Sequence, residues 1–260
     1  MDTTRVKASP GTTSGRARRT LCRAVAAAAL LLAGLAHGAD DALVVFGDDN
    51  YPPIIWAENG EPRGELPRIL SEVEALLGKR FTLQQSPWRR AYESALAGKG
   101  GVIGVSLTSE RQKLFDFSDP IYDDNINVIV LRGHEFAFRA LEDLNGKKLG
   151  GQLGASYGEA FDTALQNRSL VVDRDTSQIQ RLRKLLAGRI DAALIGNGHA
   201  GLDATIAADP ELLRNRDRFV ALERPLAIDR LYLAFPKSMQ AGELLQQFNA
   251  ALHRLPRSKR

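Results

Sequence analysis

The sequence predicts an α/β protein of two lobes, each a mainly parallel sheet flanked by helices. Three observations carry this prediction. Short apolar runs alternate with amphipathic helical segments from residue 42 onward, the alternation starts again near residue 125, and about 220 residues beyond a leader can bury one or two cores. Alternating strands and helices are typical of parallel sheets, because each helix returns the chain across a face of the sheet.

The first 38 residues predict a secretory signal peptide. Basic residues gather in residues 1–23, residues 24–36 are apolar apart from Gly34, and small residues follow. The apolar run is shorter than the roughly 20 residues that span a bilayer. We expect cleavage after Gly38 or Ala39 and a mature chain in the periplasm.

The leader also carries the chain's excess of positive charge. The whole chain has a formal net charge of +4, with 35 Lys and Arg against 31 Asp and Glu. Six of these bases and one acid lie in residues 1–38, so the mature chain has 29 bases, 30 acids and a net charge of −1. This balance argues against a nucleic-acid partner. Cys22, the single cysteine, leaves with the leader, which excludes disulfides and thiolate chemistry from the mature chain.

The first lobe is expected to begin with an apolar strand at 42–47, followed by the turn-rich segment DDNYPP. A helix over 67–77 has apolar residues at helical spacing and ends at Gly78. Ser86 and Pro87 open a second helix, which Gly98 ends, and a strand covers 101–107.

The second series starts with a strand inside 125–133. We then expect strands at 146–154, 170–173 and 190–196, with helices at 156–165 and 177–187 between them. A strand at 230–236 and an amphipathic helix at 241–252 close the chain.

Residues 154–158 match the G-x-S-x-G pattern of a hydrolase nucleophile elbow around Ser156. Asp191 and either His199 or His253 follow in the order that a catalytic triad would need. The preceding strand is too polar for a central hydrolase strand, and an HGGG-type oxyanion motif is missing upstream. The pattern therefore favours an anion-binding helix N-terminus over a nucleophile, with a structural N-cap as the remaining alternative.

Residues 104–122, GVSLTSERQKLFDFSDPIY, place Arg111 just beyond a strand that ends in small hydroxylated residues. Open α/β sheets bind ligands at this edge, and arginine can hold a carboxylate through two parallel hydrogen bonds. The stretch resembles the extracellular solute-binding proteins of family 3, the polar amino-acid type that serves ABC importers. The resemblance extends through WRRA at 88–91, AGRIDAAL at 187–194 and LYLAFPK at 231–237.

This resemblance implies a type II periplasmic-binding-protein clamp, joined by a two-strand hinge. Lobe 1 would comprise 39–121 and 231–260, lobe 2 would comprise 126–227, and the hinges would fall near 121–125 and 227–231. It also implies roles for single residues: Arg111 and Ser156 for a carboxylate, Gly104 and Ser106 for an amine, Tyr51 as an aromatic wall, and Asp48 for a cationic side chain. Trp88 is a further candidate for the ligand cleft. The expected partners are a small carboxylate-bearing solute and an inner-membrane ABC permease, with the protein a monomer.

One departure concerns the ligand's amine. The related amino-acid binders place an Asp two residues after DAAL, where this chain has Gly196. An ammonium without a counter-charge is costly in a desolvated cleft. Either Asn197 or Asp48 compensates, or the ligand is a carboxylate without an amine.

Simpler interpretations stay open for several residues. Arg111 would also suit a structural ion pair, and Trp88 and Tyr92 lie at helical spacing that suits the core. The histidines are isolated, so we assign no metal site, cofactor or catalytic residue. The alternatives to a transport protein are a sensor component that presents the ligand, and a cyclohexadienyl dehydratase-like enzyme, which would need a general acid facing the arginine. Asp48, Asp49 and His199 are the candidates for that acid.

Overall fold

A mixed sheet of ten strands organises the part of the chain that the computed structural model describes, residues 1–4 and 42–256. Its order is β10-β9-β11-β8-β13-β6-β1-β5, while β7 pairs with β13 and β12 with β8. The strands are β1 (Leu43–Asp48), β5 (Phe81–Ser86), β6 (Gly101–Ser106), β7 (Phe115–Phe117), β8 (Tyr122–Leu131), β9 (Lys148–Gln152), β10 (Val171–Asp175), β11 (Ala192–Ile195), β12 (Phe219–Ala221) and β13 (Ala227–Pro236).

Two parallel groups of strands form the two lobes of the clamp. In lobe 1, β1 lies parallel to both β5 and β6, and in lobe 2, β9 lies parallel to both β10 and β11. Residues 42–256 belong to one structural unit, so both lobes are part of the same body. The predicted α/β clamp is confirmed, whereas the predicted signal peptide and its cleavage site at Gly38 or Ala39 lie outside the described residues.

Strands β8 and β13 cross between the lobes. Residues 122–126 of β8 pair antiparallel with residues 227–231 of β13. Beyond this ladder β8 continues beside β11 and β12, whereas β13 continues beside β6 and β7. We propose these two paired segments as the hinge.

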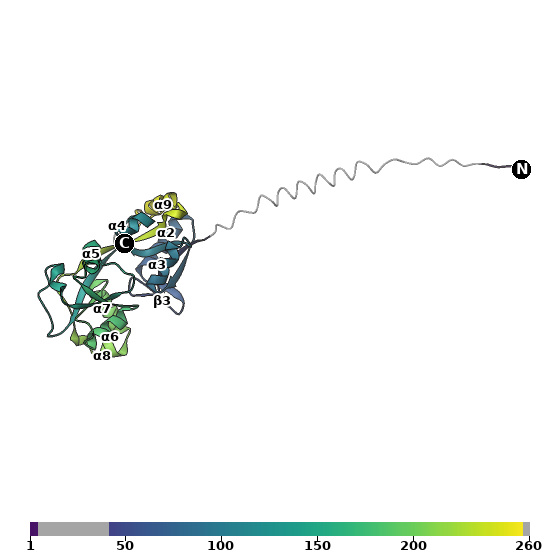
Figure 1. The fold of residues 1–260 in the computed structure, drawn as a ribbon. Helices are drawn as coiled ribbons and strands as arrows, with labels where there is room; N and C mark the ends of the chain where they lie inside the picture. Colours follow the sequence, from purple (N-terminus) through teal and green to yellow (C-terminus); the bar gives the residue numbers. More distant parts are fainter. Residues whose placement is uncertain (5–41, 257–260) are drawn as a thin grey trace. The chain divides into compact units, whose positions relative to one another are not determined.

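Helices cover both faces of the sheet (Figure 1). Lobe 1 has α2 (Glu65–Leu77), α3 (Trp88–Leu96), α4 (Ser109–Leu114), α9 (Gly242–Leu252) and the 3-10 turn η3 (Lys237–Met239). Lobe 2 has α5 (Glu159–Gln166), α6 (Gln178–Leu186), α7 (Gly198–Ala207), α8 (Pro210–Arg214) and the 3-10 turns η1 (Leu141–Leu144) and η2 (Arg216–Arg218). A small second sheet, β2 (Asn50–Tyr51), β3 (Ile55–Glu58) and β4 (Glu61–Arg63), follows β1.

Each lobe has apolar clusters on both sides of its strands. In lobe 1, α2 and α9 pack together over one face, and the buried side of α3 covers the other. In lobe 2, Phe161 of α5 belongs to one cluster, whereas Leu182 and Leu185 of α6 belong to the second. The clusters therefore give each lobe its own packed core on either side of the ladder between β8 and β13.

Several local predictions are confirmed and others need correction. Helix α2 ends at Gly78, which has a left-handed φ of 66°, and Ser177 caps α6 through its side chain. Helix α5, however, begins at Glu159 with Gly158 as its N-cap, so Ser156 lies in the loop before the helix. Pro87 is the N-cap of α3, because Ser86 still belongs to β5.

A buried ion pair lies beneath the ligand side of lobe 2. The Arg181 side chain is 1% exposed and that of Asp175 is fully buried; their closest contact is 2.8 Å. Arg181 Nε also donates to Asp175 at 3.3 Å, and Nη1 donates to the carbonyl of Leu194. The pair therefore fixes α6 against β10 and β11.

Removing one partner of this pair should destabilise the protein strongly, because the other charge stays buried. We expect Asp175→Asn to lower the free energy of unfolding by about 3–5 kcal/mol in urea denaturation. Asp203→Asn is the control, since its pair with Arg216 is 60% and 59% exposed and exposed pairs contribute about 1 kcal/mol or less. Equal losses in the two variants would contradict the prediction.

Candidate functional site

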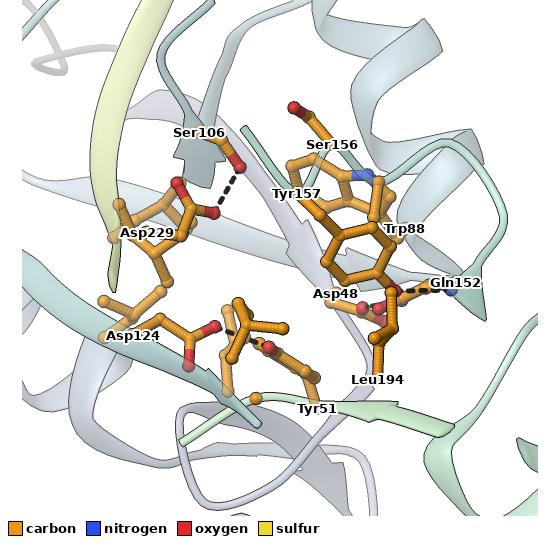
Figure 2. A pocket seen from close by; sticks show the side chains of 18 of the residues that line it. Asp48, Tyr51, Trp88, Ser106, Asp124, Gln152, Ser156, Tyr157, Leu194 and Asp229 are labelled. Carbon is orange, nitrogen blue, oxygen red and sulfur yellow. Dashed lines mark hydrogen bonds between the residues drawn. The ribbon is translucent and has the colours of Figure 1, made fainter. Parts of the chain in front are cut away.

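A cavity of about 40 Å³ lies between the lobes at the hinge (Figure 2). Both lobes and both crossing strands contribute side chains to it. Most of the predicted ligand-binding residues line this cavity: Asp48, Tyr51, Trp88, Gly104, Ser106 and Ser156. The cavity wall does not include Arg111 or Asn197.

Hydrogen bonds between the lobes close the walls around the cavity. Trp88 Nε1 donates to the carbonyl of Gly154 at 3.1 Å, and Gln152 Nε2 donates to Asp48 Oδ2 at 2.5 Å. Nearer the rim, Ser109 Oγ donates to Glu159 Oε1 at 2.7 Å. Trp88 thus belongs to the lobe 1 core and also to the cavity wall, which combines its two predicted roles.

Arg111 is buried beside the cavity, on helix α4. Its Nη1 donates to the carbonyl of Ser106 at 2.9 Å, its Nη2 donates to the carbonyl of Gly154 at 3.2 Å, and its guanidinium lies 5.0 Å from the centre of the Tyr92 ring. These partners are carbonyl oxygens and an aromatic face, and no carboxylate of residues 1–4 or 42–256 forms an ion pair with the side chain. Arg111 lines a neighbouring hollow together with Ser156.

Ser156 lies between the cavity and that hollow. Its hydroxyl donates to the carboxylate of Asp162 and accepts the backbone N–H of Gly158 at 3.2 Å. Neither partner is a histidine, and His199 is exposed. The arrangement is a loop fixed at the start of α5, and it differs from the Ser-His pair that the elbow motif would need.

Asp48 ends strand β1 and faces lobe 2. Its carboxylate accepts from Gln152 and from the backbone N–H of Asn50. Burial raises the pKa of Asp48 to about 6, and these two hydrogen bonds only partly offset the effect of burial. Asp48 therefore joins the lobes through a neutral amide partner.

Asp124, on β8, points into the cavity from the hinge (Figure 2). Its Oδ2 accepts the hydroxyl of Tyr51 at 2.5 Å, and its Oδ1 accepts the backbone N–H of Asn197. The residue is 1% exposed, and burial raises its pKa to about 6 against the effect of both hydrogen bonds. Asn197 thus contributes its backbone here, while its side chain accepts from Tyr122.

Asp229, on β13, is the neighbouring carboxylate of the hinge (Figure 2). It accepts the hydroxyl of Ser106 at 2.6 Å. Burial raises the pKa of Asp229 to about 7, and the negative charge of Asp124 adds to this rise, whereas Ser106 and Arg111 oppose it. Sequence reasoning missed Asp124 and Asp229; the available signal was the presence of acidic residues in both predicted hinge segments, Asp123 and Asp124 in the first and Asp229 in the second.

A residue without a side chain is required at Gly196, where Tyr51 and Asp124 meet. A Cβ at this position would overlap the hydroxyl of Tyr51 and lie 2.8 Å from Asp124 Oδ2. The space beside Gly196 is therefore filled by a carboxylate from β8.

Arg181 is the cationic residue of the cavity wall, among the described residues that line it. Its charge is matched by Asp175, which leaves the carboxylates of Asp48, Asp124 and Asp229 facing the cavity. Within residues 1–4 and 42–256, no group of three or more His, Cys, Asp or Glu side chains could hold a metal ion. Among the helices of the same residues, none is long and apolar enough to cross a membrane.

The fold and this cavity define a two-lobed ligand-binding protein. The chain belongs to the bacterial extracellular solute-binding proteins, family 3, which it matches over residues 43–260. The resemblance found in the sequence is thereby confirmed.

Characterised relatives share the fold and much of its length. The chain is 29% identical over 192 residues to the L-cystine-binding protein TcyJ of Escherichia coli (strain K12), covering 70% of this chain and 71% of that protein. Holo ArgBP from T. maritima is similar with a TM-score of 0.64 and 25% identity, covering 81% and 88% of the two chains. A histidine kinase sensor domain with similarity to periplasmic binding proteins has a TM-score of 0.68 and 22% identity, covering 82% of this chain and 89% of that chain. This is a likeness of fold alone.

Replacing Gly196 should disturb the site without changing its charge. We expect Gly196→Ala to lower the free energy of unfolding by about 1–3 kcal/mol, because the methyl group must displace Tyr51 or Asp124. Gly242→Ala is the matched control, since a Cβ there has open space. Urea denaturation of both variants measures the difference, and equal stability would contradict the steric role of Gly196.

The buried carboxylates should make the ligand-free protein less stable as the pH rises. Asp48, Asp124 and Asp229 have pKa values of about 6, 6 and 7 in the folded protein, and near 3.8 otherwise, so the folded state binds more protons between these limits. The free energy of unfolding should fall from about pH 5 to about pH 8, by at most about 1.4 kcal/mol per pH unit for each group.

Urea denaturation of protein refolded without ligand measures this profile. Asp48→Asn should show a smaller fall between about pH 5 and about pH 7, because one titrating group is gone. A stability that is flat or rises over this range would contradict the assignment of the three carboxylates.

Proposed function

We propose that the mature protein captures a small amino-acid-type solute in the periplasm and delivers it to an ABC permease of the inner membrane. The observation that carries this proposal is the cavity at the hinge, enclosed by both lobes and lined by polar groups from each. Ligand binding between two lobes favours the closed arrangement, which is the state a permease can distinguish from the empty protein.

The carboxylate of the ligand would bind at the Arg111 side of the cavity. The two carbonyl bonds of Arg111 use two of the five N–H donors of a guanidinium, which leaves donors for a bidentate contact. Ser156 lies beside Arg111 in the same hollow and can add a hydroxyl or backbone donor. The Tyr92 ring under the guanidinium keeps this geometry fixed.

The relatives support an amino acid as the ligand class. TcyJ is named for L-cystine, and the T. maritima protein for arginine. Both ligands combine a carboxylate with at least one cationic group, which suits a site with Arg111 on one side and aspartates on the other. We propose a monomer that works by binding and hinge closure alone.

A lyase on the same fold is the second candidate, because Asp229 has the property of a general acid. Its pKa is raised to about 7 by burial, and it faces the cavity. A prephenate-type dicarboxylate, however, would have to enter beside the carboxylates of Asp48, Asp124 and Asp229. This repulsion favours the binding protein, and the absence of turnover with prephenate would agree with it.

A thermal-shift screen tests the proposed function. The full chain is exported, purified from the periplasm, unfolded and refolded to remove bound solute, and then heated with single L-amino acids and L-cystine. A ligand at about 100 times its Kd adds roughly 2.7 kcal/mol of stability, a rise of several degrees. A chain retained in the cytoplasm, or unchanged melting with every amino acid, would overturn the proposal.

The arginine should be essential for its geometry and not only for its charge. We expect Arg111→Lys to weaken binding of the amino acid found in the screen by at least tenfold, because an ammonium cannot make the bidentate contact. Arg89→Lys, which changes an exposed ion pair with Glu93, should bind as the wild type does. Isothermal titration calorimetry measures both affinities, and unchanged binding by Arg111→Lys would contradict the carboxylate site.

A further inference from the structure

Two carboxylates lie directly opposite each other on the crossing strands. Asp124 of β8 and Asp229 of β13 are register partners in the antiparallel ladder, and both line the cavity. Side chains of opposed residues project from the same face of a sheet with their Cβ atoms about 5 Å apart, and like charges there are destabilising. Figure 2 shows both carboxylates on the same side of the cavity.

Within the described part of the chain, these carboxylates accept hydrogen bonds from uncharged donors only. Asp124 accepts from a phenol and a backbone N–H, and Asp229 accepts from the hydroxyl of Ser106. The cation of the cavity wall, Arg181, is bound to Asp175. A buried pair of acids is usually matched by a cation or a metal. Among the described residues, the charge of Arg111 acts on Asp229, but the hydrogen bonds of Arg111 go to carbonyl oxygens, and no group of side chains could hold a metal ion.

We propose that a cationic group of the ligand, a primary ammonium, binds between Asp124 and Asp229 and supplies the missing positive charge. This inference rests on the proposed function, because it concerns the same cavity. On this proposal the ligand is an amine. An amine without a carboxylate should therefore still bind, whereas a carboxylate without an amine should not.

The position of the pair also gives the ammonium a mechanical role. Asp124 lies on the strand that continues into lobe 2, and Asp229 on the strand that continues into lobe 1. A cation between them removes repulsion within the hinge ladder itself. Tyr51 of lobe 1 and the Asn197 backbone of lobe 2 both donate to Asp124, so the same carboxylate contacts each lobe.

Matched probes separate the amine from the carboxylate. The first set is L-cystine, cystamine, which lacks the carboxylates, and 3,3′-dithiodipropionate, which lacks the amines. The second set is L-glutamine, 4-aminobutanamide and glutaramate, related in the same way. Calorimetry with the exported, ligand-free protein should detect the amines of at least one set, while its amine-free acid binds at least tenfold more weakly.

Variants then locate the amine. Asp229→Asn keeps the shape of the side chain and an oxygen for the Ser106 hydroxyl, and it should lose at least tenfold in affinity for the amines. Asp124→Asn should lose as much affinity for the amines. This substitution also disturbs two hydrogen bonds that Asp124 accepts, from Tyr51 and from the backbone of Asn197, so it carries the greater risk of misfolding. Asp123→Asn is the control on the same strand, since Asp123 is exposed and pairs with Arg230 at 3.7 Å, and its affinity should stay within about twofold of wild type.

A second readout needs no ligand. At about pH 8, Asp229→Asn should melt at the same temperature as the ligand-free wild type or above it, because it removes one of two opposed charges. A lower melting temperature together with unchanged amine affinity would overturn the hinge site.

The outcomes also separate this inference from the proposed function. Equal binding of an amine and its amine-free acid, or undiminished affinity in both hinge variants, would overturn the ammonium site and leave a solute-binding protein. Failure of every probe and of the whole amino-acid panel would overturn both.

Discussion

The antiparallel ladder between β8 and β13 is the constraint on which the rest of the structure depends. It is the place where two separately packed parallel sheets become one ten-stranded sheet. Because each crossing strand ends in a different lobe, the hydrogen bonds of this short ladder fix where the two cavity walls meet. A shift of one residue in either strand would turn the aspartate of that strand to the opposite face and separate Asp124 from Asp229.

Polar groups buried at such a ladder carry an energetic cost that the fold itself does not require. Apolar residues in place of Asp124 and Asp229 would suit a buried ladder between two cores, since both strands become largely apolar beyond the ladder, at 126–131 of β8 and 231–236 of β13. The raised pKa values of both carboxyls report that cost, which arises mainly from desolvation. A loss of folding stability at a cavity is typical of a binding site in which the ligand supplies the opposite charge. Exposed pairs such as Arg89 with Glu93 contribute about 1 kcal/mol or less and cannot serve that purpose.

The sequence predicts the regular elements well where periodicity is strong. Strands β1, β6 and β9, and helices α2, α6 and α9, follow from apolar spacing and from capping residues such as Ser177 and Gly78. The two-residue strand β2 and its partners are too short to produce a pattern, and α7 has apolar or small residues on most sides, so neither was predicted. The predicted start of α5 at Ser156 is also too early, since the helix begins at Glu159. The Ser156 hydroxyl accepts the backbone N–H of Gly158 in the loop just before the helix.

The site was predictable only in part, because its chemistry depends on pairs that are distant in the chain. The family resemblance indicated Asp48, Tyr51 and Ser106, but the pairing of Asp124 with Asp229 joins residues that only the hinge register brings together. Gly196 shows why a position-by-position comparison falls short. Read along the chain, it is a missing carboxylate; in space, the room that its absent Cβ leaves is occupied by Tyr51 and Asp124. What a binding site needs is a charged group at the right place beside the ligand. In this chain that group comes from β8 and not from position 196.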